Sequence, residues 1–334
     1  VQLMAGKINN VYGGSNTKGN IRNGSSITTV DKDGSEGCCA ELSVKEIYGG
    51  GKVAPMEGGA EIVLGCMPED WIGEIYAGAQ QADVGNDVSL TITSGKFGRV
   101  FGGNKDSGKI DGYIEVNIEE CPTCGKPGIV IGELYGGGNL APYIYSKIDN
   151  YPDYKSPRVN VRSFTSIGTI YGGGYGEGAE VTGNPMVNIN VGMVPGGGLD
   201  YDEEDKPEGV NVYPHLKDKI GVIGNVFGGG NAAKVNGNTY VNIGTTEYEV
   251  LAGITAGESD VSGYYTRSGE GTTEDPFVYT EVMPTPPATK VLAAEDTLYY
   301  IRVLGADIRG NVYGGGNNAE VTGDTNVVIG KNNN

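Results

Sequence analysis

Residues 226–231 read Val-Phe-Gly-Gly-Gly-Asn, and residues 312–317 read Val-Tyr-Gly-Gly-Gly-Asn. An aliphatic residue, an aromatic residue and a triplet of small residues recur in this order along the chain. Such regular self-similarity indicates a repeat protein, so we take the aromatic as the reference position of each repeat. The eight reference aromatics are Tyr12, Tyr48, Tyr76, Phe101, Tyr135, Tyr171, Phe227 and Tyr313.

Two alternating stretches follow each aromatic. A short one is seen in Ala233-x-Val235, and a second apolar pair comes fourteen and sixteen residues after the aromatic, as in Ile62 and Leu64. Alternation with a period of two favours β-strands, and no stretch shows helical spacing with capping residues. With the strand that carries the aromatic, each repeat is predicted to hold about three short strands. Only the fifth repeat is badly stretched, since its pair lies at Val159 and Val161.

The length of the repeat selects the architecture. The shortest repeat runs from Tyr76 to Phe101, which is enough for one three-sided coil and too short for four propeller strands with their turns. One repeat cannot bury enough apolar surface to fold alone, so stability is expected to come from stacking. We therefore predict an all-β, right-handed parallel β-helix of about eight turns, forming a single domain over residues 1–334.

The glycine triplet is predicted to turn one corner of each coil, because glycine adopts positive φ and lets neighbouring turns approach closely. One position further along, an asparagine can tolerate the left-handed region and bond to its counterpart one turn away. A polar ladder is therefore expected along this edge, formed by Asn16, Asn139, Asn231 and Asn317. The same position is occupied in the other repeats by Lys52, Gln80, Lys105 and Tyr175.

Long insertions follow the third strand of several repeats, at residues 30–43, 119–130, 192–221 and 244–307. They are predicted to decorate one corner of the molecule, where loops of repeat proteins commonly bind partners. A steric or solubilising role is the alternative. The last insertion contains two strand-like runs, at 277–283 and 297–304, and is expected to form a loop or a small β-hairpin lobe.

All five cysteines fall in the predicted connections at this corner. Cys39, or its neighbour Cys38, is close enough in repeat position to pair with Cys66, and Cys121 could pair with Cys124. A zinc site is the alternative, because Cys121-Pro-Thr-Cys124 followed by Gly-Lys-Pro-Gly resembles a zinc knuckle. Free thiols are the third possibility.

The composition limits the partners. The chain carries 59 glycines, 21 tyrosines, a single histidine and a net charge of −18, so phosphate backbones and anionic membranes are disfavoured. No catalytic residue, cofactor site or metal site is predicted, since the familiar catalytic motifs are missing and a triad would have to pass through His215. The acidic segment 200–205 could bind calcium, but a solvated loop is preferred. No membrane-inserting run is present.

The repeat resembles the glycine-rich β-helix repeats of large secreted or surface proteins of gut-type bacteria, and more loosely the solenoids of adhesins and autotransporter passengers. Read as Ile-Gly-x-Val-Tyr-Gly-Gly-Gly-Asn, Ala-x-Val-x-Gly and Thr-x-Val-x-Ile-Gly, it is clearest in residues 223–244 and 308–330. The resemblance covers most of the chain outside the insertions. It implies an extracellular or cell-surface location and supplies no catalytic residues.

These observations favour a structural and adhesive module, a stiff rod or filament that presents its inserted loops to glycans or host surface proteins. The first residues look like the end of a preceding coil and no polar cap is evident, so we expect a longer array or copies stacked end to end. The competing class is an enzyme acting on polysaccharides, with carboxylates along one sheet. Its candidate residues are Glu61, Asp83, Glu115, Glu320 and Asp324.

Overall fold

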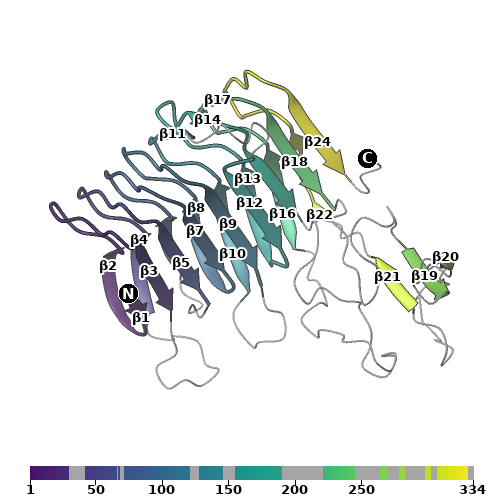
Figure 1. The fold of residues 1–334 in the computed structure, drawn as a ribbon, viewed down its shortest axis with the longest axis horizontal. Coiled ribbons are helices and arrows are strands. Elements are labelled where there is room, and N and C mark those ends of the chain that lie inside the picture. Colours follow the sequence, from purple (N-terminus) through teal and green to yellow (C-terminus); the bar gives the residue numbers. More distant parts are fainter. Residues whose placement is uncertain are drawn as a thin grey trace.

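The computed structural model describes residues 1–29, 42–65, 67, 71–120, 128–145, 155–189, 221–244, 263–268, 278–282, 298–301 and 307–329. These residues form β-strands and turns, without an α-helix, as the sequence predicts (Figure 1). None of this described part is a helix long and apolar enough to cross a membrane. The all-β class is therefore confirmed.

Two long parallel sheets make up most of the described structure (Figure 1). Sheet 1 contains, in order, β1 (Gln2–Leu3), β3 (Ser25–Thr29), β5 (Ala60–Leu64), β7 (Val88–Ile92), β9 (Ile114–Glu119), β12 (Arg158–Arg162), β15 (Met186–Ile189), β18 (Thr239–Ile243) and β24 (Thr325–Ile329). Sheet 2 contains β2 (Gly6–Tyr12), β4 (Leu42–Tyr48), β6 (Trp71–Tyr76), β8 (Gly95–Phe101), β10 (Ile129–Tyr135), β13 (Ser166–Tyr171), β16 (Val222–Phe227) and β22 (Asp307–Ile308), with β23 (Val312–Tyr313) also paired to β16.

A third, short parallel sheet lies between the two in chain order. It contains β11 (Tyr143–Ile144), β14 (Val181–Thr182) and β17 (Val235–Asn236), and Val235 continues it to Val321. In the first four repeats the same place is held by single bridges that join Ile21, Met56, Val84 and Ile110. The chain therefore visits sheet 2, this third strand position and sheet 1 in turn.

The repeat period of the sequence matches the pairing register of the sheets, because residues at the same repeat position lie opposite each other. Tyr135 of β10 lies opposite Phe101 of β8 on one side and Tyr171 of β13 on the other. In sheet 1 the stretched fifth repeat keeps the same register, because Val159 lies opposite Val116. Parallel strands stacked in this way are consistent with a β-solenoid.

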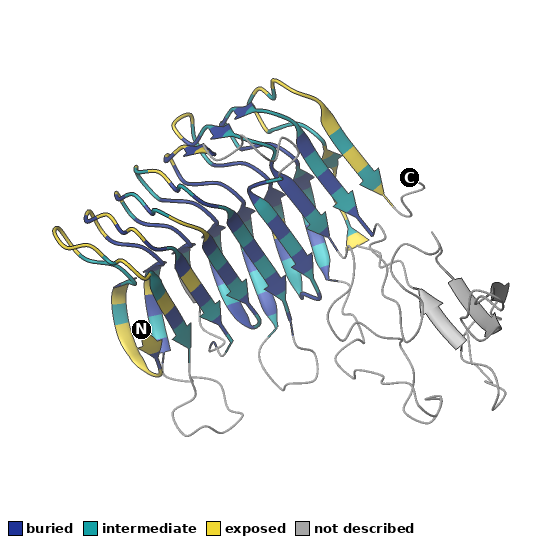
Figure 2. Ribbon diagram, viewed as in Figure 1, coloured by how far each residue is buried: buried dark blue, intermediate teal, exposed yellow. Residues whose placement is uncertain are grey.

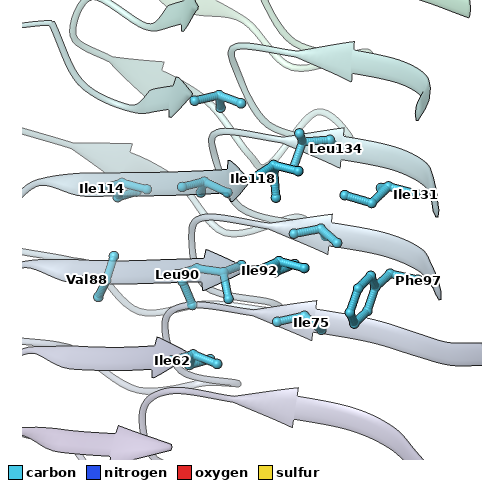
Figure 3. Close-up of a cluster of buried hydrophobic side chains, with 14 of the residues drawn as sticks. Ile62, Ile75, Val88, Leu90, Ile92, Phe97, Ile114, Ile118, Ile131 and Leu134 are labelled. Atoms are coloured by element: carbon cyan, nitrogen blue, oxygen red, sulfur yellow. The ribbon is translucent and has the colours of Figure 1, made fainter. Parts of the chain in front are cut away.

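The aliphatic core lies between sheets 1 and 2, where inward-facing residues of both are fully buried (Figure 2). Figure 3 shows Ile118 of sheet 1 and Leu134 of sheet 2 pointing into the same interior. Each such side chain contributes about 1.5–3 kcal/mol by leaving water. The alternating buried positions of β9, from Ile114 to Ile118, show why the period-two pattern forms these strands.

The glycine triplets are needed for close approach rather than for positive φ. A Cβ atom on Gly136 would overlap the carbonyl oxygen of Gly172 in the next repeat, and one on Gly49 would overlap that of Ala77. No described triplet glycine has a φ in the left-handed region. The first half of our prediction for the corner was therefore wrong, and the second half accounts for the glycines.

A separate antiparallel sheet is formed within residues 244–307, where a hairpin lobe or loop was predicted. It has the order β20 (Val278–Val282), β19 (Gly263–Ser268) and β21 (Leu298–Ile301). Both strand-like runs of the sequence contribute a strand, and β19 joins them as the central strand.

Candidate functional surface

The eight repeat aromatics form one continuous stack along sheet 2. Consecutive ring centroids lie 4.6–5.1 Å apart and consecutive ring planes differ by 3–12°. This spacing matches the distance of about 4.8 Å between strands, so the strand ladder sets the ring stacking. The rings of Tyr48, Tyr76, Phe101 and Tyr135 are completely buried.

The stack is a cluster of its own, distinct from the aliphatic core. In β10 the core residue Leu134 is followed directly by Tyr135, and neighbouring residues of a strand point to opposite faces. The ring therefore lies on the outer face of sheet 2 and packs against the rings above and below it. The aromatic and aliphatic residues of sheet 2 therefore form two separate columns on its opposite faces.

Carboxylates two residues before the aromatics receive their hydroxyl hydrogen bonds. Tyr48 donates to Glu46 at 2.7 Å and Tyr76 donates to Glu74 at 2.6 Å. Residues two apart share a strand face, so the sequence spacing places each pair side by side. Burial and then the bonded carboxylate raise the pKa of both Tyr48 and Tyr76 above its usual value.

A second set of partners comes from two repeats further along the chain. The residue four places after an aromatic reaches the hydroxyl of the aromatic two repeats earlier. These bonds join Gln80 to Tyr12 (2.6 Å), Lys105 to Tyr48 (3.1 Å), Asn139 to Tyr76 (3.2 Å) and Asn231 to Tyr135 (3.3 Å). The predicted edge position therefore couples repeats that are not neighbours.

The sixth repeat departs from this pattern in a consistent way. Its edge residue is Tyr175, and the aromatic two repeats earlier is Phe101, which has no hydroxyl. The guanidinium of Arg99 lies 5.6 Å from the ring centroids of both Phe101 and Tyr175. Cation–π contacts thus take the place that a hydrogen bond has in the other repeats.

An ionic network covers part of the same surface. The amine of Lys105 lies 2.9 Å from Glu46 and 3.7 Å from Glu74, and Arg99 forms an ion pair with Glu74. Burial raises the pKa of Glu46, but the hydrogen bonds from Lys105 and Tyr48 outweigh it, so the pKa lies below its usual value.

The predicted polar ladder of asparagines is interrupted. The left-handed backbone conformation expected of them lies one residue further along the chain. Among the four asparagines, Asn317 donates to Asn231 at 3.1 Å. Tyr175 separates Asn139 from Asn231 in the pairing, and Asn16 is exposed. The left-handed φ expected of the asparagines belongs instead to the next position, at Leu140, Gly176, Ala232 and Asn318.

A more regular amide ladder lies on the outer face of sheet 1, and the sequence analysis missed it. The side chains bond in series: Asn160 to Asn117 at 2.9 Å, Asn188 to Asn160 at 2.8 Å, and Asn242 to Asn188 at 2.9 Å. The signal was present, because each asparagine is the middle residue of an apolar pair such as Val241 and Ile243.

Asn104 replaces the third triplet glycine of the fourth repeat, and its side chain is buried. Its Oδ1 accepts from the amide of Ala79 at 2.7 Å, and its Nδ2 donates to the carbonyls of Ala82 at 3.0 Å and Ser107 at 3.3 Å. The departure is therefore a specific structural feature.

The remaining predicted residues fall into two groups. Cys39, Cys66, Cys121 and Cys124, together with His215 and the segment 200–205, lie outside the described residues. Within the described part, no group of three or more His, Cys, Asp or Glu side chains is placed to hold a metal ion. The disulfide, zinc and calcium alternatives therefore stay predictions.

Four of the five carboxylates considered for an enzyme have structural partners, and at Asp324 the bond is made by the backbone amide. Asp83 accepts from the backbone amide of Lys109 at 2.9 Å, Glu115 accepts from Asn160 at 3.3 Å, and Glu320 pairs with Lys234 at 3.0 Å. Glu61 accepts from Ser26 at 3.3 Å, and the backbone amide of Asp324 bonds to Asn238 at 2.8 Å.

Comparisons with protein-family models, curated proteins and solved structures find no match to this chain. A proposal for its function therefore depends on the arrangement of its own residues.

Proposed function

We propose that the chain is a right-handed β-solenoid of about eight turns that acts as a stiff structural and adhesive rod outside a bacterial cell. The observation that carries this proposal is the unbroken stack of aromatics from Tyr12 to Tyr313, set by the register of sheet 2. Bending such a rod would open strand ladders and ring contacts together. Bonds that span two repeats, such as Asn139 to Tyr76, oppose the same distortion.

The rod is proposed to belong to a longer array, with copies or further turns of the same chain as its axial partners. Its inserted segments would form the adhesive face toward glycans or host surface proteins, because they all follow strands of sheet 1 and so share one corner. The net charge of −18 supports partners other than nucleic acid and anionic membranes.

Electron microscopy and small-angle X-ray scattering of the purified chain test the shape. Eight coils at a strand spacing of about 4.8 Å give a rod about 40 Å long. A particle without a long axis, or with a different repeat along it, would contradict the proposal. Microscopy of native material should then show filaments or surface projections.

An enzymatic assay separates the rod from the competing class. The purified chain is incubated with neutral and acidic polysaccharides, and reducing ends and unsaturated sugars are measured. We expect binding at most, with no release of either product. Turnover that disappears in a Glu61→Gln/Glu115→Gln variant would replace the structural proposal by a polysaccharide-acting enzyme.

A further inference from the structure

The aromatic stack combines two features that packing alone does not require. Phenol rings lie in contact one after another, and the hydroxyls of Tyr48, Tyr76 and Tyr135 each donate to a carboxylate. A phenol loses an electron far more readily than a phenylalanine ring, and its oxidised form is a strong acid. A phenol in this stack can therefore lose an electron and pass its proton to the bonded carboxylate.

We propose that this column gives up single electrons to an external one-electron oxidant, such as a high-valent metal complex. The radical that results is held on the carboxylate-bonded tyrosines. In each event the oxidant gains one electron. The phenol Tyr–OH and the carboxylate Glu–COO⁻ become the radical Tyr–O• and the acid Glu–COOH, so the proton stays within the hydrogen bond. No other bond forms or breaks, and the proposal does not depend on the chain being a rod or an adhesin.

The hydroxyl bonds place a base where the proton must go. The donor–acceptor distances are 2.7 Å for Tyr48, 2.6 Å for Tyr76 and 3.2 Å for Tyr135, within the reach of direct proton transfer. Burial is the largest influence on these three phenols and raises the pKa of each. The phenols therefore stay protonated before oxidation, and loss of the electron has to be coupled to loss of the proton.

The ring contacts allow the oxidised state to move from one tyrosine to the next. Tyr48 and Tyr76 stack directly at 5.1 Å. Tyr76 and Tyr135 are separated by the single ring of Phe101, which lies 5.0 Å from one and 4.7 Å from the other. All four rings are fully buried, which shields a radical there from water and from other radicals.

The proton step is tested with photogenerated tris(bipyridine)ruthenium(III) as the oxidant. Tyrosyl radical is followed by transient absorption and electron paramagnetic resonance at neutral pH. In the wild-type chain the rate of radical formation should be independent of the concentration of buffer base. In the Glu46→Gln/Glu74→Gln/Glu133→Gln variant the proton has to leave to solvent, so the rate should fall and become dependent on buffer base. The same buffer dependence in both proteins would overturn the proposal.

The position of the stored radical is tested by removing phenols while keeping the rings. A Tyr48→Phe/Tyr76→Phe/Tyr135→Phe variant should lose the long-lived radical, whereas Tyr143→Phe should keep it. Tyr143 is a matched control, because it is also buried but bonds to the carbonyl of Gly112 and to Ser156. Circular dichroism and thermal unfolding establish that each variant is folded. A radical lifetime equal in all three proteins would place the oxidised residue outside the three carboxylate-bonded tyrosines and overturn the proposal.

Discussion

The first four and last four repeats share both long sheets but differ at the corner that follows the glycine triplet. The difference concerns the backbone amide of the fifth residue after the aromatic. Val53 in the second repeat donates backward, to the carbonyl of Asn16, whereas Leu140 in the fifth donates forward, to the carbonyl of Tyr175. The backward bond recurs at Gln81 and Asp106, and the forward bond recurs at Gly176 and Ala232.

A single backbone angle accounts for this reversal. The residues with forward bonds have left-handed φ values, 63° for Leu140, 83° for Gly176 and 52° for Ala232, and Val53 does not. A left-handed residue turns its peptide N–H toward the opposite neighbour. Asn318 shares the conformation at 54°. The same glycine triplet therefore supports two corners, which differ in the φ of the residue two places beyond it.

The largest expected effect tests what both corners have in common. Gly49→Ala in the first half and Gly136→Ala in the second each push a Cβ into the carbonyl oxygen of the next repeat. Each should lower the free energy of unfolding by about 3 kcal/mol or more, because backbone atoms in a stacked array have no room to move. Urea unfolding measures the loss. Gly315→Ala is the control, since a Cβ there has no atom within 4 Å. Tolerance in one half alone would mean that the halves also differ at the triplet.

A second change addresses the junction between the two halves. Asn104→Gly restores the glycine that other triplets have, yet it leaves the amide of Ala79 and the carbonyl of Ala82 without their buried partner. We expect a loss of about 2 kcal/mol in the free energy of unfolding. Asn104→Ala serves as the control, because it removes the same hydrogen bonds without adding the backbone freedom of glycine. Stabilisation by Asn104→Gly would show that the repeat pattern outweighs these hydrogen bonds.

The sequence predicted the sheets well because their signal is periodic. Positions such as Val159 and Val116 share a slot in the pattern, and the strand register follows from that slot. The corner was less predictable. Asparagine at 139 and leucine at 140 are adjacent, and composition favours asparagine for the left-handed position, yet the hydrogen bond to Tyr175 puts the strain on Leu140. Tertiary pairing overrode local preference.

Side-chain partners across repeats were predicted least. The bond between Asn139 and Tyr76 spans two repeats, so no local pattern points to it. The ladder from Asn117 to Asn242 could be predicted from the middle residue of each apolar pair. Solvent-facing positions of a strand carry varied residues, however, so their sequence pattern is weaker than that of the buried positions. The cysteine alternatives fall on residues that the structure does not describe.

The third prediction sharpens the difference between the corners. Leu140→Gly should raise the free energy of unfolding by about 0.5–1 kcal/mol, because relief of about 1–2 kcal/mol of left-handed strain exceeds the entropy cost of glycine. Val53→Gly is the matched control at the same repeat position without positive φ, and it should lower stability by about 0.5–1 kcal/mol. The two side chains are exposed to a similar extent, 50% for Leu140 and 43% for Val53, so the loss of packing is similar in the two variants. Thermal unfolding of the two variants measures the effect, and equal shifts would mean that φ does not distinguish the corners.

The smallest effect concerns charge, which is concentrated in repeats two to five. Two residues before the aromatic, repeats two to five carry Glu46, Glu74, Arg99 and Glu133, whereas the next repeat carries Thr169. The pKa of Glu46 lies below its usual value in the folded chain, so its ionised form stabilises the fold. This contribution is present above the unfolded pKa of about 4.3 and is lost as the pH falls through the lower folded value.

Glu46→Gln should therefore reduce stability at neutral pH by less than about 1 kcal/mol, since the ion pair with Lys105 is near the surface. The difference from wild type should shrink as the pH falls below about 4, where the carboxylate is protonated. Added salt should shrink it at neutral pH as well. Thr169→Ser gives the matched neutral variant, for which neither pH nor salt should change the difference. If Glu46→Gln behaved like Thr169→Ser in both titrations, the ionic network would be an incidental contact and the two halves would differ only in backbone geometry.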